Sequence, residues 1–211
     1  MTRGLNWRNR LSHVSIWRGS IPEIWLGLAD KVRLPELRLT TRDISDYDVL
    51  MKKRLDVLRT HRITMKDIHE VVRTIAPLPG VPEFMAWLRP RSQVIILSDT
   101  FYEFVQPMME QLQFPTIFCH TLGIDREGFI TDYFLRQKDQ KRHAVRALQS
   151  LGFRVLAGGD SYNDVSMLQE ADAGFFFCPP ESIVQEYPQF PVATTYPEFQ
   201  EHLGRAGGFS S

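Results

Sequence analysis

The stretch Gly158–Asp164, which reads G-G-D-S-Y-N-D, constrains the fold more than any other part of the sequence. It follows Phe153–Ala157, an apolar run with the length and residue types of a buried strand. After it, Val165, Leu168 and Ala171 form one helical stripe. The two glycines allow the backbone to turn sharply between these segments. The pattern predicts a strand-to-helix turn in an α/β fold.

Two carboxylates in this turn, Asp160 and Asp164, allow two interpretations. Ligands of open α/β sheets bind at the carboxyl ends of the strands. Hard carboxylate oxygens at such a place suit Mg²⁺, which also takes phosphate oxygens of a substrate. Aspartate, serine and asparagine are equally good N-cap residues, so the stretch is also compatible with an ordinary helix start.

Composition limits which kinds of partner the protein binds and in which compartment of the cell it works. The formal net charge is zero, which gives no electrostatic argument for nucleic acid or an anionic membrane surface as a partner. No apolar run approaches the roughly 18 residues of a membrane span. The two cysteines, Cys119 and Cys178, are far apart and favour buried thiols in a reducing compartment over a disulfide scaffold. We therefore expect a cytoplasmic protein.

The first 20 residues differ from the rest of the chain. They contain Arg3, Arg8, Arg10 and Arg18, and the first acidic residue is Glu23. An arginine-rich, acid-poor start is typical of a mitochondrial targeting segment. A frayed tail is the simpler alternative.

Three helices without an intervening strand follow, which predicts a helical insert. They begin at Pro22, Tyr47 and Met65. Arg54 lies inside the apolar stripe of the second helix, Tyr47–Leu58. A guanidinium that faces inward needs a partner from the protein or a ligand. The alternative is an arginine that snorkels at the edge of the stripe.

From Gly80 onward, strands alternate with helices, which is typical of a doubly wound sheet. We expect helices over Val81–Leu88, Phe101–Leu112, Asp139–Leu151 and Glu181–Glu186, strands over Val94–Leu97, Thr116–Cys119 and Gly174–Phe177, a hairpin near Gly123–Tyr133, and a mobile tail from Gly204. Lys141 falls in the first turn of its helix, where a cation opposes the helix dipole. An anion bound there would explain it, and a solvated basic turn is the alternative.

Three features fall at equivalent ends of the predicted sheet: Ser98 with Asp99, Lys141, and Asp160 with Asp164. A hydroxyl, a lysine and metal-binding acids that converge on one pocket are suited to phosphate chemistry. The chain resembles the haloacid dehalogenase superfamily, and more narrowly the phosphoserine phosphatases that also transfer phosphate to homoserine. The matching stretches include P-E-I-W from Pro22, L-S-D-T-F-Y-E-F from Leu97, L-R-Q-K-D from Leu135 and G-D-S-Y-N-D from Gly159.

The resemblance covers about Ile21 to Tyr196 and implies a fold, a cofactor and a pathway. The fold would be a Rossmann-like three-layer α/β core with a parallel sheet, built from residues 1–22 and 77–211. A small helical cap, residues 23–76, would be inserted into it. The enzyme would hydrolyse phosphoserine, a small-molecule substrate, with Mg²⁺, and would serve serine or threonine biosynthesis.

The resemblance also implies a role for each matching residue. Asp160 would bind Mg²⁺, with Asp164 at the same metal site. Ser98 and Asp99 would hold the phosphoryl group, and Lys141 would neutralise its developing charge. Substrate contacts would come from three further residues, which are Asn163, Glu23 for the amine and Arg54 for the carboxylate.

The chemical centre of the family is missing from this chain. Members begin with a strand that ends in D-x-D/E-G, where the first aspartate attacks phosphorus and the second acid protonates the leaving oxygen. The family's spacing, counted back from Pro22, places Ser15 at the nucleophile position and Trp17 at the acid position. A serine there lacks a base and removes a metal ligand, and tryptophan cannot transfer a proton. We therefore expect the chain as written to be inactive.

The genetic code offers an explanation for this loss. Residues 11–20 can be encoded so that a reading frame two bases later gives I-A-C-L-D-L-E-G-I, a strand that ends in the missing motif. We hypothesise that residues 1–20 are out-of-frame translation. Because this strand would be central in the sheet, poor stability is a further expectation. The alternative function is a non-catalytic protein that binds a phosphoamino acid.

Overall fold

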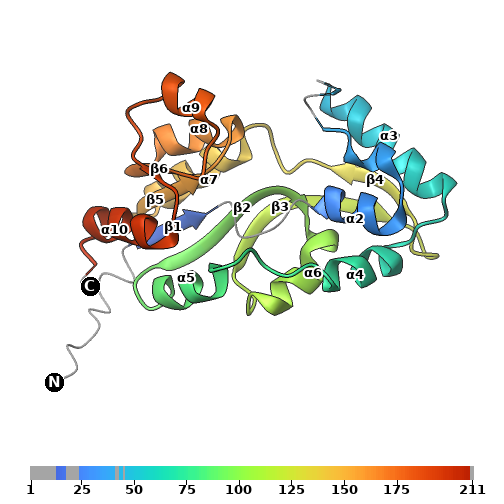
Figure 1. Cartoon of the computed structure of the whole chain (residues 1–211), viewed down its shortest axis with the longest axis horizontal. Helices are drawn as coiled ribbons and strands as arrows, with labels where there is room; N and C mark the ends of the chain where they lie inside the picture. The colour runs from blue at the N-terminus through green and yellow to red at the C-terminus, as the bar shows by residue number, and fades with distance from the viewer. Residues whose placement is uncertain (1–12, 18–23, 41–42, 45, 210–211) are drawn as a thin grey trace.

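The computed structural model describes residues 13–17, 24–40, 43–44 and 46–209. Its elements in chain order are β1 His13–Trp17, α2 Ile24–Val32, the 3-10 helix η1 Pro35–Arg38, α3 Tyr47–Thr60, α4 Met65–Arg73, α5 Val81–Leu88, β2 Gln93–Phe101, α6 Tyr102–Gln111, β3 Thr116–Ile124, β4 Ile130–Phe134, α7 Gln140–Ser150, β5 Arg154–Gly159, α8 Tyr162–Glu170, β6 Ala173–Phe177, α9 Glu181–Glu186, β7 Val192–Ala193 and α10 Tyr196–Gly207 (Figure 1).

One seven-stranded sheet organises the described chain, in the order β4-β3-β2-β1-β5-β6-β7. All neighbouring strands are parallel except β3 and β4, which form the predicted antiparallel hairpin. The first strand therefore lies in the middle of the sheet, between β2 and β5.

Side chains of β2 and β5 alternate between two helical layers. Ile95, Leu97 and Ala157 face a core with α7 and α8, whereas Ile96 packs with α5 and α6. Leu156, one residue from Ala157, packs with α5 and α10 instead. This two-residue period is what a strand buried on both faces requires. The predicted three-layer α/β fold is confirmed.

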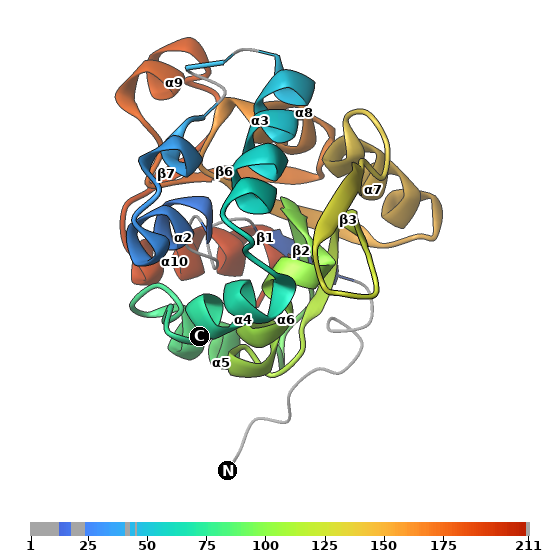
Figure 2. The same ribbon diagram turned by 90° about the vertical axis from the view of Figure 1, so that its right-hand side faces the viewer.

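The helices α2, η1, α3 and α4 form a group, here called the helical cap (Figure 2). Their apolar side chains share one core. Its fully buried members include Leu28, Leu37, Met51 and Ile68. Thr64 and Asp67 form a reciprocal capping box that begins α4.

Hydrogen bonds from α3 and α4 join the helical cap to α6 and to the β3–β4 hairpin. The Met65 amide donates to the Gly128 carbonyl at 2.8 Å, and His69 Nε2 lies 2.5 Å from the carbonyl oxygen of Glu103 in α6. The Tyr133 hydroxyl of β4 donates to Asp48 of α3 at 2.5 Å. The helical cap therefore rests on the hairpin and on α6.

Strands β2 and β3 and the end of the chain differ from expectation, and β3 continues to Ile124, five residues past the predicted Cys119. Strand β2 continues through Phe101, four residues further than predicted, because Phe101 pairs with His120 of β3 after a register shift. The chain after Gly204 is not a free tail, since α10 continues to Gly207 and the Phe209 ring packs against it. None of the helices in the described part of the chain combines the length and apolarity that a bilayer crossing needs.

Candidate active site

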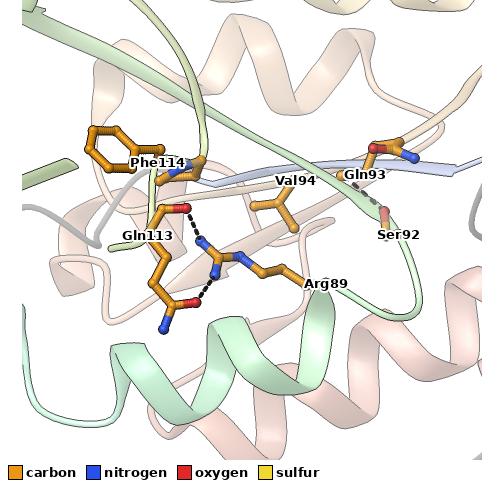
Figure 3. Close-up of a pocket in the computed structure, with 7 residues that line it drawn as sticks. Arg89, Ser92, Gln93, Val94, Gln113 and Phe114 are labelled. Atoms are coloured by element: carbon orange, nitrogen blue, oxygen red, sulfur yellow. Dashed lines mark hydrogen bonds between the residues drawn. The ribbon is translucent and has the colours of Figure 1, made fainter. Parts of the chain in front are cut away.

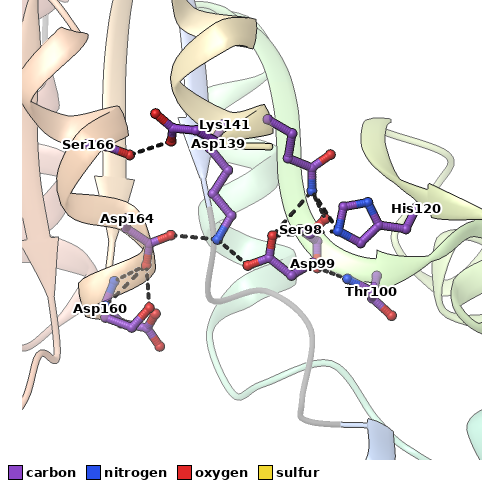
Figure 4. Close-up of polar contacts among 11 residues, drawn as sticks. Ser98, Asp99, Thr100, His120, Asp139, Lys141, Asp160, Asp164 and Ser166 are labelled. Atoms are coloured by element: carbon purple, nitrogen blue, oxygen red, sulfur yellow. Dashed lines mark hydrogen bonds and ion pairs between the residues drawn. The ribbon is translucent and has the colours of Figure 1, made fainter. Parts of the chain in front are cut away.

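Three segments far apart in the sequence meet at the carboxyl edge of the sheet (Figure 4). Asp99 comes from the end of β2, Lys141 from the first turn of α7, and Asp164 from the first turn of α8 after β5. Lys141 Nζ lies 2.8 Å from Asp99 Oδ2 and 2.9 Å from Asp164 Oδ1. Because β2 and β5 flank β1, this ammonium bridges two carboxylates across the end of the central strand.

Lys141 is buried, with 3% of its side chain exposed. The interpretation as a solvated basic turn is therefore wrong. The two carboxylates offset the unfavourable position of a cation at a helix start. Asp139 occupies the predicted N-cap position, but its φ of 52° turns its side chain to the Ser166 hydroxyl, which donates to it at 2.7 Å.

Asp164 serves as both a helix cap and an ion-pair partner. Its side chain is fully buried, and Oδ2 accepts hydrogen bonds from the Asp160 and Ser161 amides and the Ser161 hydroxyl at 2.9–3.1 Å. Its other oxygen meets Lys141. The carboxylate thus holds the backbone of Asp160, which follows β5 directly, and the helix-start interpretation of this stretch is confirmed for Asp164.

Two residues that the sequence analysis did not single out, Gln140 and His120, fix the end of β2. Gln140 Nε2 donates to the Ser98 carbonyl at 2.8 Å and to Asp99 Oδ1 at 3.2 Å. His120 Nε2 lies 4.0 Å from the same Asp99 oxygen. The only sequence signal for Gln140 is its place beside Lys141, and His120 had none.

The tautomer of His120 follows from its hydrogen bonds. Its Nδ1 accepts from the Arg136 amide at 3.1 Å, so the proton of the neutral ring is on Nε2, toward Asp99. Burial lowers the pKa of His120, although the charge of Asp99 opposes this effect. The ring is therefore neutral at pH 7.

Arg54 of α3 is buried, with 5% exposed, so it is not a snorkelling side chain. Its guanidinium donates to the Leu39 carbonyl at 2.7 Å and lies 4.4 Å from the centre of the Trp25 ring. Burial, helped by the charge of Asp99 and opposed by that of Arg54, raises the pKa of Tyr47 to about 12. Tyr47, at the start of α3, therefore lies within electrostatic reach of both Asp99 and Arg54.

The backbone register of β1 does not bring Ser15 to the carboxyl edge. Ser15 pairs with Val94 and Leu156, which precede Ser98 and Asp160 by four residues each. The expectation that Ser15 lies in the site is therefore not met by the strand pairing. The backbone of His13–Trp17 occupies the central position of the sheet in a register that the family's spacing does not give.

The other predicted site residues divide into exposed, half-buried and undescribed ones. Asn163 is exposed in the first turn of α8, and Ser98 and Asp160 are half-buried at the edge of the sheet. Glu23 lies outside the described residues, as do residues 1–12. The side chains at positions 15 and 17 are likewise outside the description.

The donors for Mg²⁺ fit only in part. No group of three or more candidate ligands occurs among the residues that the structure describes. Both oxygens of Asp164 are held by protein donors, and Asp160, half-buried at the same turn, is the second carboxylate there. Because Mg²⁺ keeps waters and takes phosphate oxygens, one carboxylate would hold it weakly without a bound phosphate.

A pocket of about 180 Å³ lies at the opposite edge of the sheet, where β2 begins (Figure 3). Arg89 extends into it and donates to the Gln113 side chain at 2.8 Å and to the Leu112 carbonyl. These acceptors lie at the end of α6, where a cation complements the helix dipole. The position of Arg89 in this pocket is therefore explained by its bonds to the end of α6, and the pocket is separate from the carboxylate cluster.

Comparisons with known proteins show the family of the chain. The profile of a family described as haloacid dehalogenase-like hydrolase matches residues 21–172. The chain is 53% identical over 190 residues to phosphoserine phosphatase ThrH of Pseudomonas aeruginosa, which covers 90% of this chain and 93% of that protein. It is 52% identical to a phosphoserine phosphatase of Pseudomonas syringae pv. tomato, over 88% of this chain and 78% of that protein.

Solved structures share the fold. A phosphoserine phosphatase in its apo form superposes with a TM-score of 0.71 at 19% identity, covering 90% of this chain and 96% of that one. A substrate-bound phosphoserine phosphatase complex gives a TM-score of 0.68 at 18% identity, covering 90% and 97%. The matched family profile begins at residue 21, directly after the compositionally different segment.

Proposed function

The chain belongs to the haloacid dehalogenase-like hydrolases, and on that basis we propose that it derives from a Mg²⁺-dependent phosphoserine phosphatase. The observation that carries the proposal is Lys141, held between Asp99 and Asp164 across the end of β1. A fixed cation at that point is positioned for a phosphoryl group presented at the carboxyl edge of the sheet.

The proposal gives each residue of the site a role. Lys141 and the Ser98 hydroxyl hold the phosphoryl oxygens, and Asp160 is the residue that would bind Mg²⁺. The metal, when bound, supplies positive charge to the phosphoryl oxygens. Arg54 and Glu23 recognise the carboxylate and the amine of the amino acid, and Asn163 contacts the substrate.

The chain as written is proposed to lack turnover. A nucleophilic aspartate would displace the serine oxygen from phosphorus, and an acid would give that oxygen its proton; Ser15 and Trp17 supply neither group. Relatives that are 53% and 52% identical to this chain are named phosphoserine phosphatases, and the proposed loss concerns the first segment alone. Phosphotransfer to homoserine uses the same missing step and belongs to the restored enzyme.

The alternative is a binding protein that keeps the phosphoamino-acid pocket. The buried Arg54 and Lys141 favour it, because both cations remain in place without a catalytic aspartate. Such a protein binds O-phospho-L-serine and leaves it intact.

One experiment separates these possibilities. Phosphate release from O-phospho-L-serine is measured for the chain with its mass confirmed, and for a variant in which I-A-C-L-D-L-E-G-I replaces residues 11–19. That replacement includes Ser15→Asp and Trp17→Glu, and it also replaces the strand whose present register leaves position 15 short of the carboxyl edge. We expect release only from the variant, and Lys141→Met in the variant should abolish it.

Calorimetry on the chain as written decides the alternative. Binding of phosphoserine without release supports the binding protein. Release by the unaltered chain overturns the proposed loss of activity. A folded variant that neither binds nor hydrolyses phosphoserine overturns the proposed substrate.

A further inference from the structure

Both oxygens of Asp99 are engaged by consecutive residues at the start of α7. Lys141 Nζ lies 2.8 Å from Oδ2, and Gln140 Nε2 lies 3.2 Å from Oδ1 (Figure 4). Gln140 also binds the Ser98 carbonyl at 2.8 Å, so it holds the backbone that precedes Asp99. The carboxylate is therefore fixed in position by the first turn of a helix.

The groups that fix Asp99 are buried, whereas Asp99 itself is not. Lys141, His120 and Gln140 are 3%, 5% and 6% exposed, while the Asp99 side chain is 33% exposed. The carboxylate is thus the more exposed of the two partners of Lys141, and a ligand from solvent meets it first. Asp164, the other partner of the ammonium, is fully buried on the opposite side.

A carboxylate in this place works against an incoming anion. A phosphoryl group that approaches Lys141 meets an ammonium whose protons already point at two carboxylates, and its own charge is repelled by Asp99. A dianion must therefore share Lys141 with Asp99 or displace it. Gln140 opposes displacement because it holds the other oxygen.

We propose that the Asp99 carboxylate competes with phosphate-like anions for Lys141 and so lowers the affinity of the site for these anions. In the empty site Asp99 is ion-paired with Lys141. When a bound anion dissociates, this ion pair forms again. This inference rests on the proposed function only for the class of ligand, a phosphoryl anion. It changes the role of Asp99 from a phosphate-holding residue to one that limits phosphate affinity.

The test measures binding of inorganic phosphate and of sulfate by calorimetry, with a chelator present and without added metal. Sulfate is included because it stays a dianion across neutral pH. Asp99→Asn keeps the size of the side chain and removes the charge. We expect it to tighten both anions by about tenfold or more, as removal of a close charge from a partly buried site implies.

Asp139→Asn is the matched control. It removes the same charge from the same helix start, but Asp139 meets Ser166 and is not a partner of Lys141. We expect no more than a twofold change in anion affinity from this variant. A general effect of net charge would raise the anion affinity of both variants equally, and that result overturns the proposal.

A double variant shows whether the effect passes through Lys141. Asp99→Asn should increase the anion affinity of Lys141→Met by a smaller factor than it increases that of the parent chain. If Asp99→Asn lacks a cooperative melt, Asp99→Ser is measured in its place. Unchanged phosphate and sulfate affinity in the folded Asp99 variant overturns the inference, whether or not the parent chain binds phosphoserine. A gain of anion binding supports it even where phosphoserine binding, and with it the proposed substrate, fails.

Discussion

A Cβ atom placed on Gly159 would lie 2.4 Å from the Cβ of Asp164. The last residue of β5 and the carboxylate that caps α8 are therefore as close as the backbone allows. This contact lets Asp164 reach back to the Asp160 amide and forward to Lys141. Only glycine leaves room for it.

Gly159→Ala should consequently disturb the site. The added methyl group has to displace Asp164, which costs about 1–3 kcal/mol in overpacking. We expect a lower urea midpoint and weaker phosphoserine binding. Gly204→Ala in α10 is the control, because its Cβ would meet only a carbonyl oxygen at 3.7 Å. Equal effects of the two substitutions would contradict the close contact.

Lys141→Met should destabilise the fold by about 3–5 kcal/mol, because it leaves buried negative charge without its partner. Asp164 is fully buried and Asp99 is one-third exposed. Adding Asp164→Asn to Lys141→Met should therefore restore more stability than adding Asp99→Asn does. Urea unfolding of the four proteins measures this difference. The opposite order of rescue would show that Asp99 carries the larger cost.

Stability should fall on mild acidification because of His120. Burial depresses the pKa of this ring below its usual 6.5 in the folded protein. Between the folded pKa and 6.5 the unfolded chain binds more protons, so stability is complete above pH 6.5 and is lost as pH falls toward the folded pKa. Protonation also removes the acceptor for the Arg136 amide.

The check is the melting temperature between pH 7.5 and 5.5. His120→Gln should show a shallower fall than the parent chain over this range. The carboxylates with lowered pKa values, Asp48, Asp67 and Glu198, titrate in a more acidic window and do not contribute to the difference. Parallel curves for the two proteins would exclude His120 as the cause.

Arg54 should discriminate ligands by their carboxylate. Charge-assisted hydrogen bonds contribute about 1.5–3 kcal/mol, so phosphoserine should bind at least tenfold tighter than phosphoethanolamine, which lacks the carboxylate. Arg54→Met should remove this preference. Arg59→Met, on the exposed face of the same helix, should retain it. Calorimetry with both ligands measures the ratio, and a preference that survives Arg54→Met would assign carboxylate recognition elsewhere.

Local patterns predicted most elements of the fold. The bounds of α5 and α9 agree with the apolar stripes, and the turn from β5 to α8 follows from G-G-D-S-Y-N-D. Lys141 was identified because a cation at a helix start needs an explanation. These features depend on residues close together in the sequence.

Features that depend on distant partners were not predictable. Strand β2 extends because β3 pairs with Phe101, and neither segment alone indicates this. Gln140 lies 42 residues from Ser98, and its amide has no period or motif that would reveal the contact. The helix at the end of the chain is stabilised by Leu203 against the β5–β6 face of the sheet, which a tail-like composition conceals.

The central place of β1 has a consequence for the order in which the chain assembles. As synthesis proceeds, β1 can pair with β2 once Gln93 has emerged, but its other neighbour begins only at Arg154. Until then one edge of β1 offers unpaired amides and carbonyls to any other strand nearby. Such long-range closure is slow. During synthesis the sheet of this protein is therefore incomplete, with one edge of β1 unpaired. How well the sequence of the first strand fits this place decides whether β1 pairs with β5 or with a strand of another molecule.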